Sequence, residues 1–405
     1  MKIKHIIIYT FQSLEDPLVN GLILEYLKGI DNSQQKFIFH LITHEQREFA
    51  LTHEQQKEKE NFLLTLNIKW HKIKYRSGAL MLLKKIFNFL QTFFIVLKIN
   101  LKHKPAAILG FLSIAGGYSY ILSKVFRLKL IVYCFEPHSE YMIDFKIWKK
   151  TDLKYKLLKM FERLQIKSAH TVVVPNRFTK QLLEPYKPHS VLICPISIDT
   201  NRMVFDGEAR KNIRKELNAQ DKKVIIYTGK FGGIYYEADE VIRFFKKLHS
   251  INNKLFFYII TSNTEEIKQS IIKYQLPLDS FHLSFTVSYT DLNKYISAAD
   301  IGFVALPPLP SQKYRTPVKT AIYLSCGLPY LVNRNIGEDD LVAEANKVGV
   351  VIENLEENPN NINSKILNLL HMDSNELKLN CRRVAEDTRG TALAVNILNK
   401  VFSEV

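Results

Sequence analysis

The sequence predicts an α/β protein of two doubly wound domains, each with a parallel sheet covered by helices on both faces. A length of 405 residues exceeds what one hydrophobic core usually supports, so two domains are expected. A composition of 46% hydrophobic and 24% charged residues is typical of a folded globular chain. Short apolar runs alternate with longer helical patterns along nearly the whole chain, which is the pattern of parallel-sheet domains.

The apolar runs have the length of strands and form two series. Each run is apolar throughout, so each strand is expected to be buried on both faces of its sheet. The first series covers residues 5–11, 37–43, 106–111, 130–135, 171–176 and 190–195. The second series covers residues 223–229, 255–261, 281–287, 301–306, 329–334 and 348–354.

Helical patterns fill the segments between these runs. The main ones cover residues 17–29, 79–103, 114–125, 149–168, 236–250, 263–274 and 290–298. A last amphipathic helix is expected near the C-terminal end, where no strand follows it. This helix can pack on its own domain or cross back to the first one.

A domain boundary is expected near residues 196–202, between the two series of strands. Pro195 and several polar residues interrupt the apolar pattern there, and the polar stretch 207–221 precedes the next strand. Two doubly wound domains of similar size are expected to face each other across a cleft, where the carboxyl ends of their strands meet. Ligands of such sheets bind at those carboxyl ends.

The cysteines and the apolar segments indicate a cytoplasmic protein without a membrane span. The four cysteines are scattered with no Cys-x-x-Cys pair, which indicates a reducing compartment and no zinc site. Residues 1–11 have too short an apolar run for a signal peptide, so they predict the first strand. The longest apolar stretch, residues 86–101, is interrupted by Asn88, Gln91 and Lys98, and it is too short to span a bilayer.

Basic residues dominate one segment of a chain whose net charge is +16. Between Asn61 and Phe135 there are twelve Lys or Arg residues and no Asp or Glu. Such a segment attracts anions, although part of the excess follows from a composition rich in Lys, Ile and Asn. Nucleic acid is disfavoured because no recognition motif is present. We expect residues 69–104 to meet phosphorylated substrates or an anionic membrane surface, with 79–103 as a sheet-covering helix, a membrane-facing helix or both.

The stretch SQKYRTPVKTAIYLSCGLPYLV (311–332) predicts a helix that begins in a positive environment. Thr316 fits the N-cap, Pro317 the first helical position and Gly327 the residue just after the helix. Arg315 and Lys319 add cations to the free N–H groups of the helix start, a combination that binds anions. The alternative is an ordinary helix–strand unit with two solvated cations.

A glycine-rich turn follows the first strand of the second domain, in YTGKFGGIYY (227–236). Gly229, Gly232 and Gly233 let backbone N–H groups approach a phosphate, with Lys230 among them. The spacing is neither a Walker loop nor a dinucleotide fingerprint, so a turn chosen for its geometry alone is the alternative.

The glycine turn and the helix start are expected at the same edge of the second sheet. Lys230, Arg315 and Lys319 would then grip a diphosphate together with the backbone donors. The remaining candidates for contact with the donor are Thr261 and Ser262, at the end of a strand, and Thr316, Pro317 and Thr320 of the helix start.

Polar residues also follow strands of the first domain. Glu136, His138 and Glu140 alternate after the strand at 130–135, so their side chains could point to one side and orient a sugar hydroxyl or move a proton. A helix-capping or surface role is the alternative. Asp16 and Asn20, after the first strand, are expected at the same edge, and Asp16 is equally suited to cap the helix that begins at Pro17.

No metal signature or nucleophile motif is present. There is no Gly-x-Ser-x-Gly elbow, no His-Glu-x-x-His and no Asp-x-Asp triplet. Glu338, Asp339 and Asp340 are expected as an exposed acidic helix start rather than a cation site.

Several of these segments resemble the GT-B glycosyltransferases, specifically the retaining family 4 type, over essentially the whole chain. The glycine turn resembles the donor-phosphate loop of that family. The segment 194–203 resembles its interdomain segment, with Asp199 in the matching place. The helix start at 316 resembles the family's Pro-Thr-Lys-x-x-Glu-Tyr motif, and this is the most specific match. It covers Pro317, Lys319, Tyr323, Gly327 and Pro329.

This resemblance implies two Rossmann-like domains: residues 1–196 bind the acceptor, residues 197–384 bind the donor, and the helix 385–405 packs on the first domain. It implies retention at the anomeric carbon, a donor sugar diphosphate as substrate, and no metal or cofactor. Lys230 and Lys319 would neutralise the leaving diphosphate, and His138, next to Glu136, would contact the donor sugar. Positive charge is what a departing phosphate requires.

One position departs from the family pattern. Ile322 stands where the family has the glutamate that binds the ribose, and eight residues earlier stands Tyr314. A second basic residue after the phosphate loop is also missing, since Tyr235 and Tyr236 lie there. The donor is therefore a nucleotide sugar held differently or a phosphate-linked sugar without a nucleoside, or else activity has been lost.

We therefore predict a peripheral membrane glycosyltransferase that adds one sugar to a lipid-linked or polysaccharide acceptor, in bacterial capsule, lipopolysaccharide O-antigen or exopolysaccharide synthesis. A sugar-nucleotide epimerase of the same shape is one alternative. A non-catalytic relative that scaffolds a glycan-assembly complex is the other.

Overall fold

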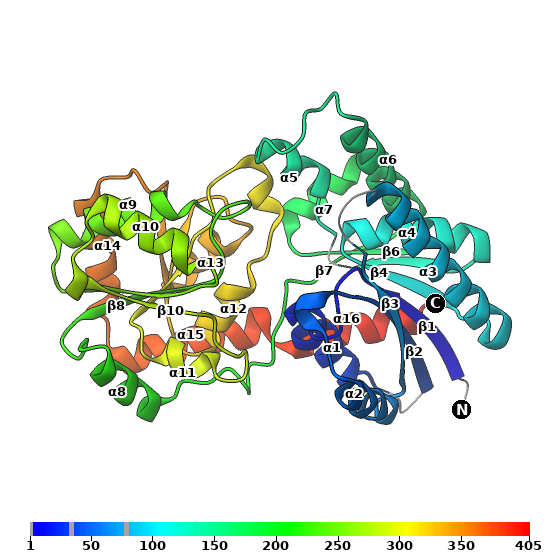
Figure 1. Cartoon of the computed structure of the whole chain (residues 1–405), viewed down its shortest axis with the longest axis horizontal. Helices are drawn as coiled ribbons and strands as arrows, with labels where there is room; N and C mark the ends of the chain where they lie inside the picture. Colours follow the sequence, from blue (N-terminus) through cyan, green and yellow to red (C-terminus); the bar gives the residue numbers. More distant parts are fainter. Residues whose placement is uncertain (1–2, 32–35, 77–80, 134) are drawn as a thin grey trace. The chain divides into compact units, whose positions relative to one another are not determined.

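The computed structural model describes residues 3–31, 36–76, 81–133 and 135–405, and it divides into two compact units (Figure 1). The N-unit is Met1–Pro195 together with Thr391–Val405, and the C-unit is Ile196–Gly390. The division after Pro195 lies next to the expected boundary at 196–202. The C-terminal helix that belongs to the N-unit begins at Thr391 and not at residue 385 as expected. Residues 385–389 are the end of the last helix of the C-unit.

The N-unit holds a seven-stranded sheet in the order β3-β2-β1-β4-β5-β6-β7. All neighbouring strands are parallel. The strands are β1 (Ile3–Tyr9), β2 (Lys36–Glu45), β3 (Ile68–Lys74), β4 (Ala107–Phe111), β5 (Lys129–Tyr133), β6 (Thr171–Val174) and β7 (Val191–Ile193).

The helices of the N-unit lie between these strands and at the end of the chain. A short π-helix, η1 (Val19–Ile23), precedes the first of them. They are α1 (Leu24–Lys28), α2 (His53–Thr65), α3 (Met81–His103), α4 (Ser113–Phe126), α5 (His138–Asp144), α6 (Leu153–Ser168), α7 (Arg177–Leu183) and α16 (Thr391–Ser403).

The C-unit holds a six-stranded parallel sheet in the order β10-β9-β8-β11-β12-β13. The strands are β8 (Lys223–Thr228), β9 (Leu255–Ile260), β10 (Phe281–Ser284), β11 (Ile301–Val304), β12 (Tyr330–Asn333) and β13 (Gly349–Ile352). The helices are α8 (Gly207–Glu216), α9 (Ala238–Ile251), α10 (Thr264–Tyr274), α11 (Leu292–Ser297), α12 (Val318–Ser325), α13 (Asp339–Asn346), α14 (Pro359–Leu370) and α15 (Ser374–Arg389).

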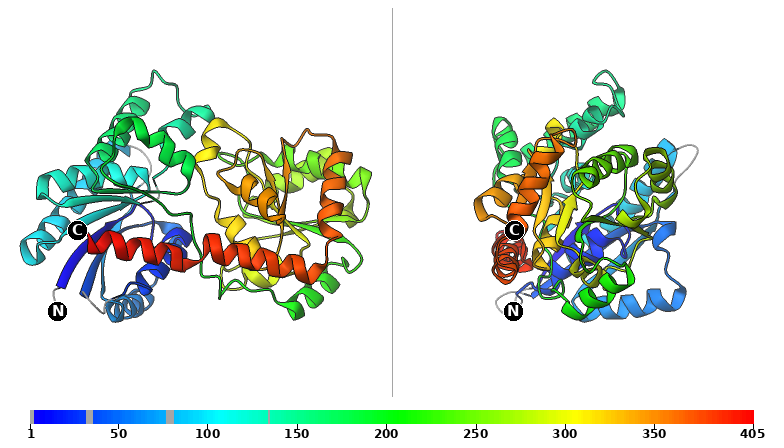
Figure 2. Two further views of the ribbon diagram at one scale, coloured as in Figure 1. Left: turned by 180° about the vertical axis from the view of Figure 1, so that it is seen from behind. Right: turned by 90° about the vertical axis from the view of Figure 1, so that its left-hand side faces the viewer.

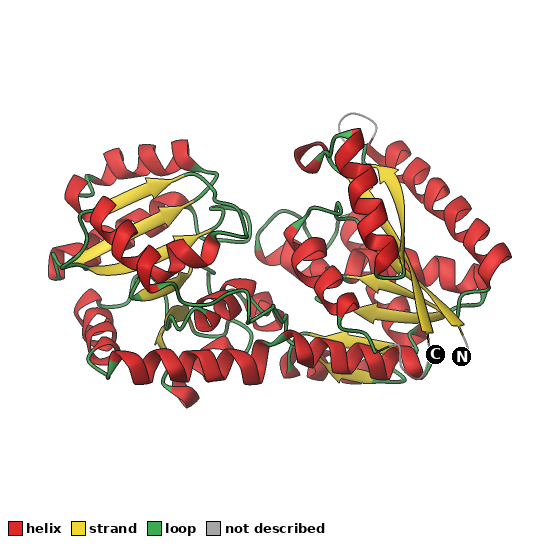
Figure 3. Ribbon diagram, turned by 90° about the horizontal axis from the view of Figure 1, so that it is seen from below, coloured by secondary structure: helices red, strands yellow, loops and turns green. Residues whose placement is uncertain are grey.

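Two doubly wound α/β units are therefore confirmed, and helices cover both faces of each sheet (Figure 3). All twelve predicted strands are present. The edge strand β3, with the sequence IKWHKIK, was not predicted, because its apolar residues are separated by lysines and only Ile68 and Ile73 are buried. An edge strand is covered less completely, so its sequence lacks the continuous apolar run of a central strand.

One face of the N-unit sheet is packed by α3, α4 and α6. Ile7 and Ile42 from the sheet contact Val96 and Ile99 of α3 and Leu122 of α4 in a single buried cluster. Because α3 alternates buried and exposed positions, only one side of this helix belongs to the core.

The helix α16 packs on the N-unit beside α1 (Figure 2). The ring of Phe402 is fully buried and lies 5.9 Å from the Phe37 ring and 5.5 Å from the Phe39 ring, between centroids. Lys4 Nζ donates to the Ser403 carbonyl at 3.1 Å. Burying one phenylalanine ring stabilises a fold by about 1.5–3 kcal/mol, so α16 is an integral part of the N-unit.

The longest helix of the N-unit, α3, is largely apolar. In the part of the chain that the structure describes, no helix combines the length and the apolar character needed to cross a membrane.

Candidate anion-binding site

The strand order of the C-unit places its binding edge between β8 and β11. The chain leaves β8 toward β9 and β10 on one side, and then returns to β11 and β12 on the other side. Ligands of doubly wound sheets bind in the crevice outside the carboxyl ends at such a switch point. The glycine turn 229–233 follows β8, and α12 follows the loop after β11, so both predicted elements border this crevice.

The helix α12 starts one residue later than predicted. Pro317, with φ −61° and ψ 129°, takes the N-cap position without a side-chain cap, while Thr316 is buried upstream of it. The end of the helix is as predicted: Gly327 has φ +69°, and its N–H donates to the Leu324 carbonyl at 2.9 Å. The N–H of Leu328 donates to the Tyr323 carbonyl at 2.9 Å, which completes a Schellman motif.

The inner side of α12 is fixed against the sheet. Tyr323 lies so close to β11 that a Cβ at Gly302 would be 2.4 Å from its ring. The Thr320 hydroxyl donates to the buried Asp339 carboxylate at 2.5 Å, and Asp339 also forms an ion pair with Arg389. Thr320 therefore anchors the helix instead of pointing toward a ligand, and the 338–340 segment is not the exposed acidic start that we expected, since Asp340 is buried as well.

Lys319 is the central cation of the site. Its Nζ lies 4.2 Å from the centroid of the Tyr235 ring and 5.0 Å from that of the Tyr227 ring. The same nitrogen lies over Gly229, where a Cβ would be 2.6 Å away. The side chain is partly buried. Two aromatic faces stabilise an ammonium at this position by cation–π attraction.

No carboxylate in the described part of the chain forms an ion pair with Lys319. Burial, assisted by the nearby charge of Arg315, lowers the pKa of Lys319 to about 7. A lysine that loses hydration and gains no protein anion is stabilised in its charged form when a ligand supplies the negative charge. Arg315 and Lys319 are therefore the candidate residues for binding an anion at this edge.

The glycine turn has the backbone that the sequence predicts. Gly229, Gly232 and Gly233 have φ values of +140°, +75° and +64°, which side-chain-bearing residues rarely adopt. The Tyr227 hydroxyl donates to the carbonyl of Lys230, so the ring that contacts Lys319 also holds the turn. The Lys230 side chain is exposed.

The residues after β9 support the turn. Asn263 Oδ1 accepts from the N–H of Phe231 at 3.1 Å, and the N–H of Asn263 donates to the Thr261 hydroxyl at 3.0 Å. Thr261 is completely buried and Ser262 is exposed. Thr261 thus positions the loop, and Ser262 is the residue of the two that a ligand can reach.

The N-unit has a second switch point, between β1 and β4. Leu112, directly after β4, has φ 70° and ψ 160°, a conformation that non-glycine residues rarely adopt. Its carbonyl accepts the N–H of Gly116, which opens α4. This strained position at the binding edge was not identified from the sequence, because no composition signal marks it.

The predicted alternation of Glu136, His138 and Glu140 is absent, because β5 ends at Tyr133 and His138 begins α5. Glu136 accepts from the Tyr141 hydroxyl at 3.0 Å. Glu140 turns to α6, where it pairs with Lys159 at 2.6 Å. Burial opposes the charge of Glu140, but Lys159 outweighs it and holds the pKa below its usual value. Glu140 and Lys159 thus form an ion pair that links α5 to α6.

A carboxyl that the sequence did not reveal positions the start of α5. Glu162 of α6 is buried, and it accepts from the Ser139 N–H at 2.9 Å and from the Ser139 hydroxyl at 2.5 Å. Burial raises the pKa of Glu162 to about 7. Since Ser139 follows His138, Glu162 fixes where the histidine enters the helix.

The residues Asp16 and Asn20 form the first turn after β1. Asp16 Oδ1 accepts from the Leu18 N–H at 2.8 Å, and the Asp16 carbonyl accepts from Asn20 at 2.9 Å. Asn20 donates to Glu15 at 3.3 Å. The Asp16 carboxylate therefore caps this turn, as one of the roles expected for it requires.

Comparison with known proteins adds to this geometry. Residues 310–401, less than a quarter of the chain, match the family model "Glucosyltransferase 3-like, C-terminal domain". No curated protein matches the chain. The structure is similar to that of the Anabaena protein HepE in complex with UDP, with a TM-score of 0.70, 13% identity and 100% of both chains covered.

Two further solved structures show the same architecture. Sucrose-phosphate synthase from Thermosynechococcus elongatus has a TM-score of 0.71 at 14% identity, with 99% of this chain and 98% of that chain covered. The chain has a glycosyltransferase-like GT-B fold. A putative UDP-N-acetylglucosamine 2-epimerase from Listeria monocytogenes shares this GT-B architecture less closely, with a TM-score of 0.58 at 12% identity and 100% and 98% coverage.

Proposed function

We propose that the protein is a retaining, metal-independent glycosyltransferase of the family 4 type. It moves one sugar from a phosphate-activated donor to a lipid-linked or polysaccharide acceptor in bacterial surface-glycan synthesis. The observation that carries this proposal is Lys319, a partly buried cation without a carboxylate partner in the described chain, placed over Gly229 at the start of α12. A leaving diphosphate provides the missing negative charge.

The chemistry of the donor end follows from the same residues. As the bond between sugar and phosphate breaks, negative charge grows on the diphosphate. In this proposal Lys319, Arg315 and the N–H groups of the glycine turn stabilise this charge. The structure of HepE with UDP-glucose, at 13% identity and a TM-score of 0.70, supports a nucleotide sugar as donor.

Donor binding should depend on pH through Lys319. Its pKa of about 7 means that the lysine is largely neutral above pH 8, whereas a bound diphosphate favours the ammonium. Binding therefore takes up a proton, and the dissociation constant of UDP-glucose should rise by up to about tenfold per pH unit above pH 7. Calorimetry in buffers of different ionisation enthalpy measures the number of protons taken up on binding. The UDP-glucose diphosphate does not itself titrate in this range, so this proton is taken up by the protein. Binding without proton uptake would contradict the assignment.

A non-catalytic scaffold is the second candidate function, because Ile322 is apolar and buried where a ribose-binding carboxylate is expected. A screen of donors by thermal shift separates the two functions. An enzyme is stabilised by a nucleotide sugar or by a phosphosugar without nucleoside, and a scaffold is stabilised by neither.

We further propose that α3 rests on an anionic membrane surface, which would bring the enzyme to a lipid-linked acceptor. Leu83, Phe87, Leu90, Phe94 and Leu101 are all exposed, up to 74% for Leu101. Their spacing places them on one side of the helix, opposite the residues packed in the core. Lys98 and Lys102 of the same helix are exposed, which suits anionic headgroups.

Replacing Leu90 and Phe94 by aspartate should reduce binding to phosphatidylglycerol vesicles at least tenfold. Two apolar side chains are lost from the contact, and two negative charges are added to it. Flotation measures the bound fraction. Phe62 on α2 is 46% exposed and lies outside this face, so Phe62→Asp is the matched control. Equal flotation of both variants and the wild type would exclude α3 as the contact.

A further inference from the structure

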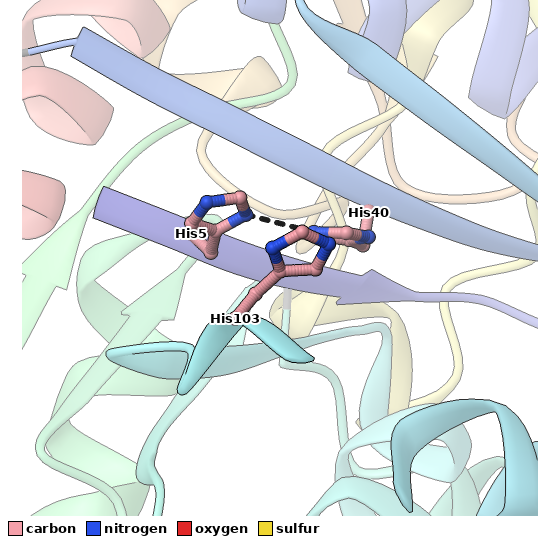
Figure 4. A group of neighbouring side chains, drawn as sticks. All are labelled: His5, His40 and His103. Atoms are coloured by element: carbon pink, nitrogen blue, oxygen red, sulfur yellow. Dashed lines mark hydrogen bonds between the residues drawn. The ribbon is translucent and has the colours of Figure 1, made fainter. Parts of the chain in front are cut away.

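Three histidines from separate elements of the N-unit converge at one point. His5 lies on β1, His40 on β2, and His103 is the last residue of α3 (Figure 4). One ring nitrogen from each lies within 4.8 Å of the others. His5 Nδ1 is 3.0 Å from His40 Nε2, and the His5 and His103 rings stack with 4.3 Å between centroids.

This geometry is close to that of a metal site. Zinc binds histidine nitrogen at about 2.0–2.1 Å with tetrahedral geometry, which places two ligand atoms about 3.4 Å apart. The His5–His40 pair is near this separation. The His103 ring is stacked on that of His5, with 14° between the two planes, so the half-buried His103 side chain must turn before its nitrogen faces the same ion. We propose that His5, His40 and His103 bind Zn²⁺, with water as the fourth ligand.

A fourth histidine supports the central ligand. His40 is 1% exposed, and its Nδ1 lies 3.1 Å from Nε2 of His71 on β3. A ligand histidine is normally held by such a bond at its second nitrogen, which fixes the ring and the tautomer. His71 is therefore a positioning residue of the proposed site.

A metal ion binds the neutral form of an imidazole, because the neutral ring keeps a lone pair for the ion. When Zn²⁺ binds, the proton shared between His5 Nδ1 and His40 Nε2 moves to a ring nitrogen outside the site, and no bond besides N–H is broken.

The surrounding charge opposes a cation and provides a test. The positive charge of Lys69 on β3 is close enough to interact electrostatically with His5, His40 and His103, and the charge of Lys102 interacts with His103. Removing one positive charge should therefore tighten the binding of Zn²⁺. If the histidines form only a neutral stack that binds no ion, removing the charge should leave Zn²⁺ binding unchanged.

The site lies away from the proposed transfer chemistry. Asp16 and His138 follow the carboxyl ends of β1 and β5, whereas His5 is near the amino end of β1, and α3 ends at His103 just before β4 begins. A zinc ion here would fasten the end of α3 to the sheet. The cysteines play no part in it, so their scattered pattern does not bear on this site.

The test is a titration of the untagged full-length protein with Zn²⁺ against a chromophoric chelator at pH 7.5. We expect one equivalent in the wild type, at least 100-fold weaker binding in His103→Gln, and 10–100-fold weaker binding in His71→Gln. Lys69→Gln should bind more tightly. His189→Gln is the control, because His189 lies beside His170, with 5.3 Å between ring centroids, in a second histidine pair of the same unit.

His103 is half-buried at a helix end, so its replacement tests the site without removing a core residue. Co²⁺ should give the absorption of a tetrahedral complex in the wild type and lose it in His103→Gln. The proposal is overturned if His103→Gln binds Zn²⁺ as the wild type does, or if His189→Gln weakens binding equally.

Discussion

Replacing Lys319 by methionine should lower sugar transfer by about 10²–10³-fold and leave the protein folded. Methionine keeps most of the apolar stem that packs beside Tyr227 and Tyr235, but it removes the ammonium that meets the leaving diphosphate. Because a partly buried cation without a carboxylate partner in the described chain is also removed, the free energy of unfolding should stay equal or rise.

The measurement is the rate of sugar transfer, or of donor hydrolysis if the acceptor is unknown. Lys254→Met is the matched control: this lysine is exposed and lies at the opposite edge of the same sheet, just before β9. Unchanged turnover in Lys319→Met, with the control also unchanged, would remove Lys319 from the mechanism.

Replacing Gly229 by alanine should weaken donor binding at least tenfold. The new Cβ would lie 2.6 Å from Lys319 Nζ and 2.7 Å from its Cε, so the lysine side chain must leave its position. The backbone also has φ +140°, where a Cβ adds strain of about 1–3 kcal/mol.

Gly233→Ala separates these two causes. Gly233 has φ +64°, but a Cβ there meets no heavy atom within 4 Å. If displacement of Lys319 is what matters, Gly229→Ala should weaken UDP-glucose binding far more than Gly233→Ala does, by calorimetry. Equal losses of affinity in both variants would mean that donor binding depends on the conformation of the turn and not on the position of Lys319.

The fold followed from the sequence wherever a strand lies in the middle of a sheet. β8 and β12 are buried on both faces, so their apolar runs predict them without further information. β3 was not predicted, because an edge strand tolerates lysines, whereas the helix expected at 17–29 is present and contains the π-helix η1.

The candidate site was predictable only where its residues are close in sequence. Gly229 and Lys319 each belong to a local turn or helix start with a chemical pattern. Glu162 and the histidines of the proposed zinc site could not be found in this way, because each gains its role from residues that lie far from it in sequence. Thr320 was misjudged for the same reason, since its partner is Asp339.

The position of α16 has a consequence for how the chain matures. Phe402 packs against Phe37 and Phe39 of β2. In the nascent chain these two rings therefore lack this partner until the entire C-unit has been translated. The ribosome adds about 5–20 residues each second, so this vulnerable interval lasts on the order of ten seconds or more. During that time chaperones that shield apolar rings have a defined patch to hold.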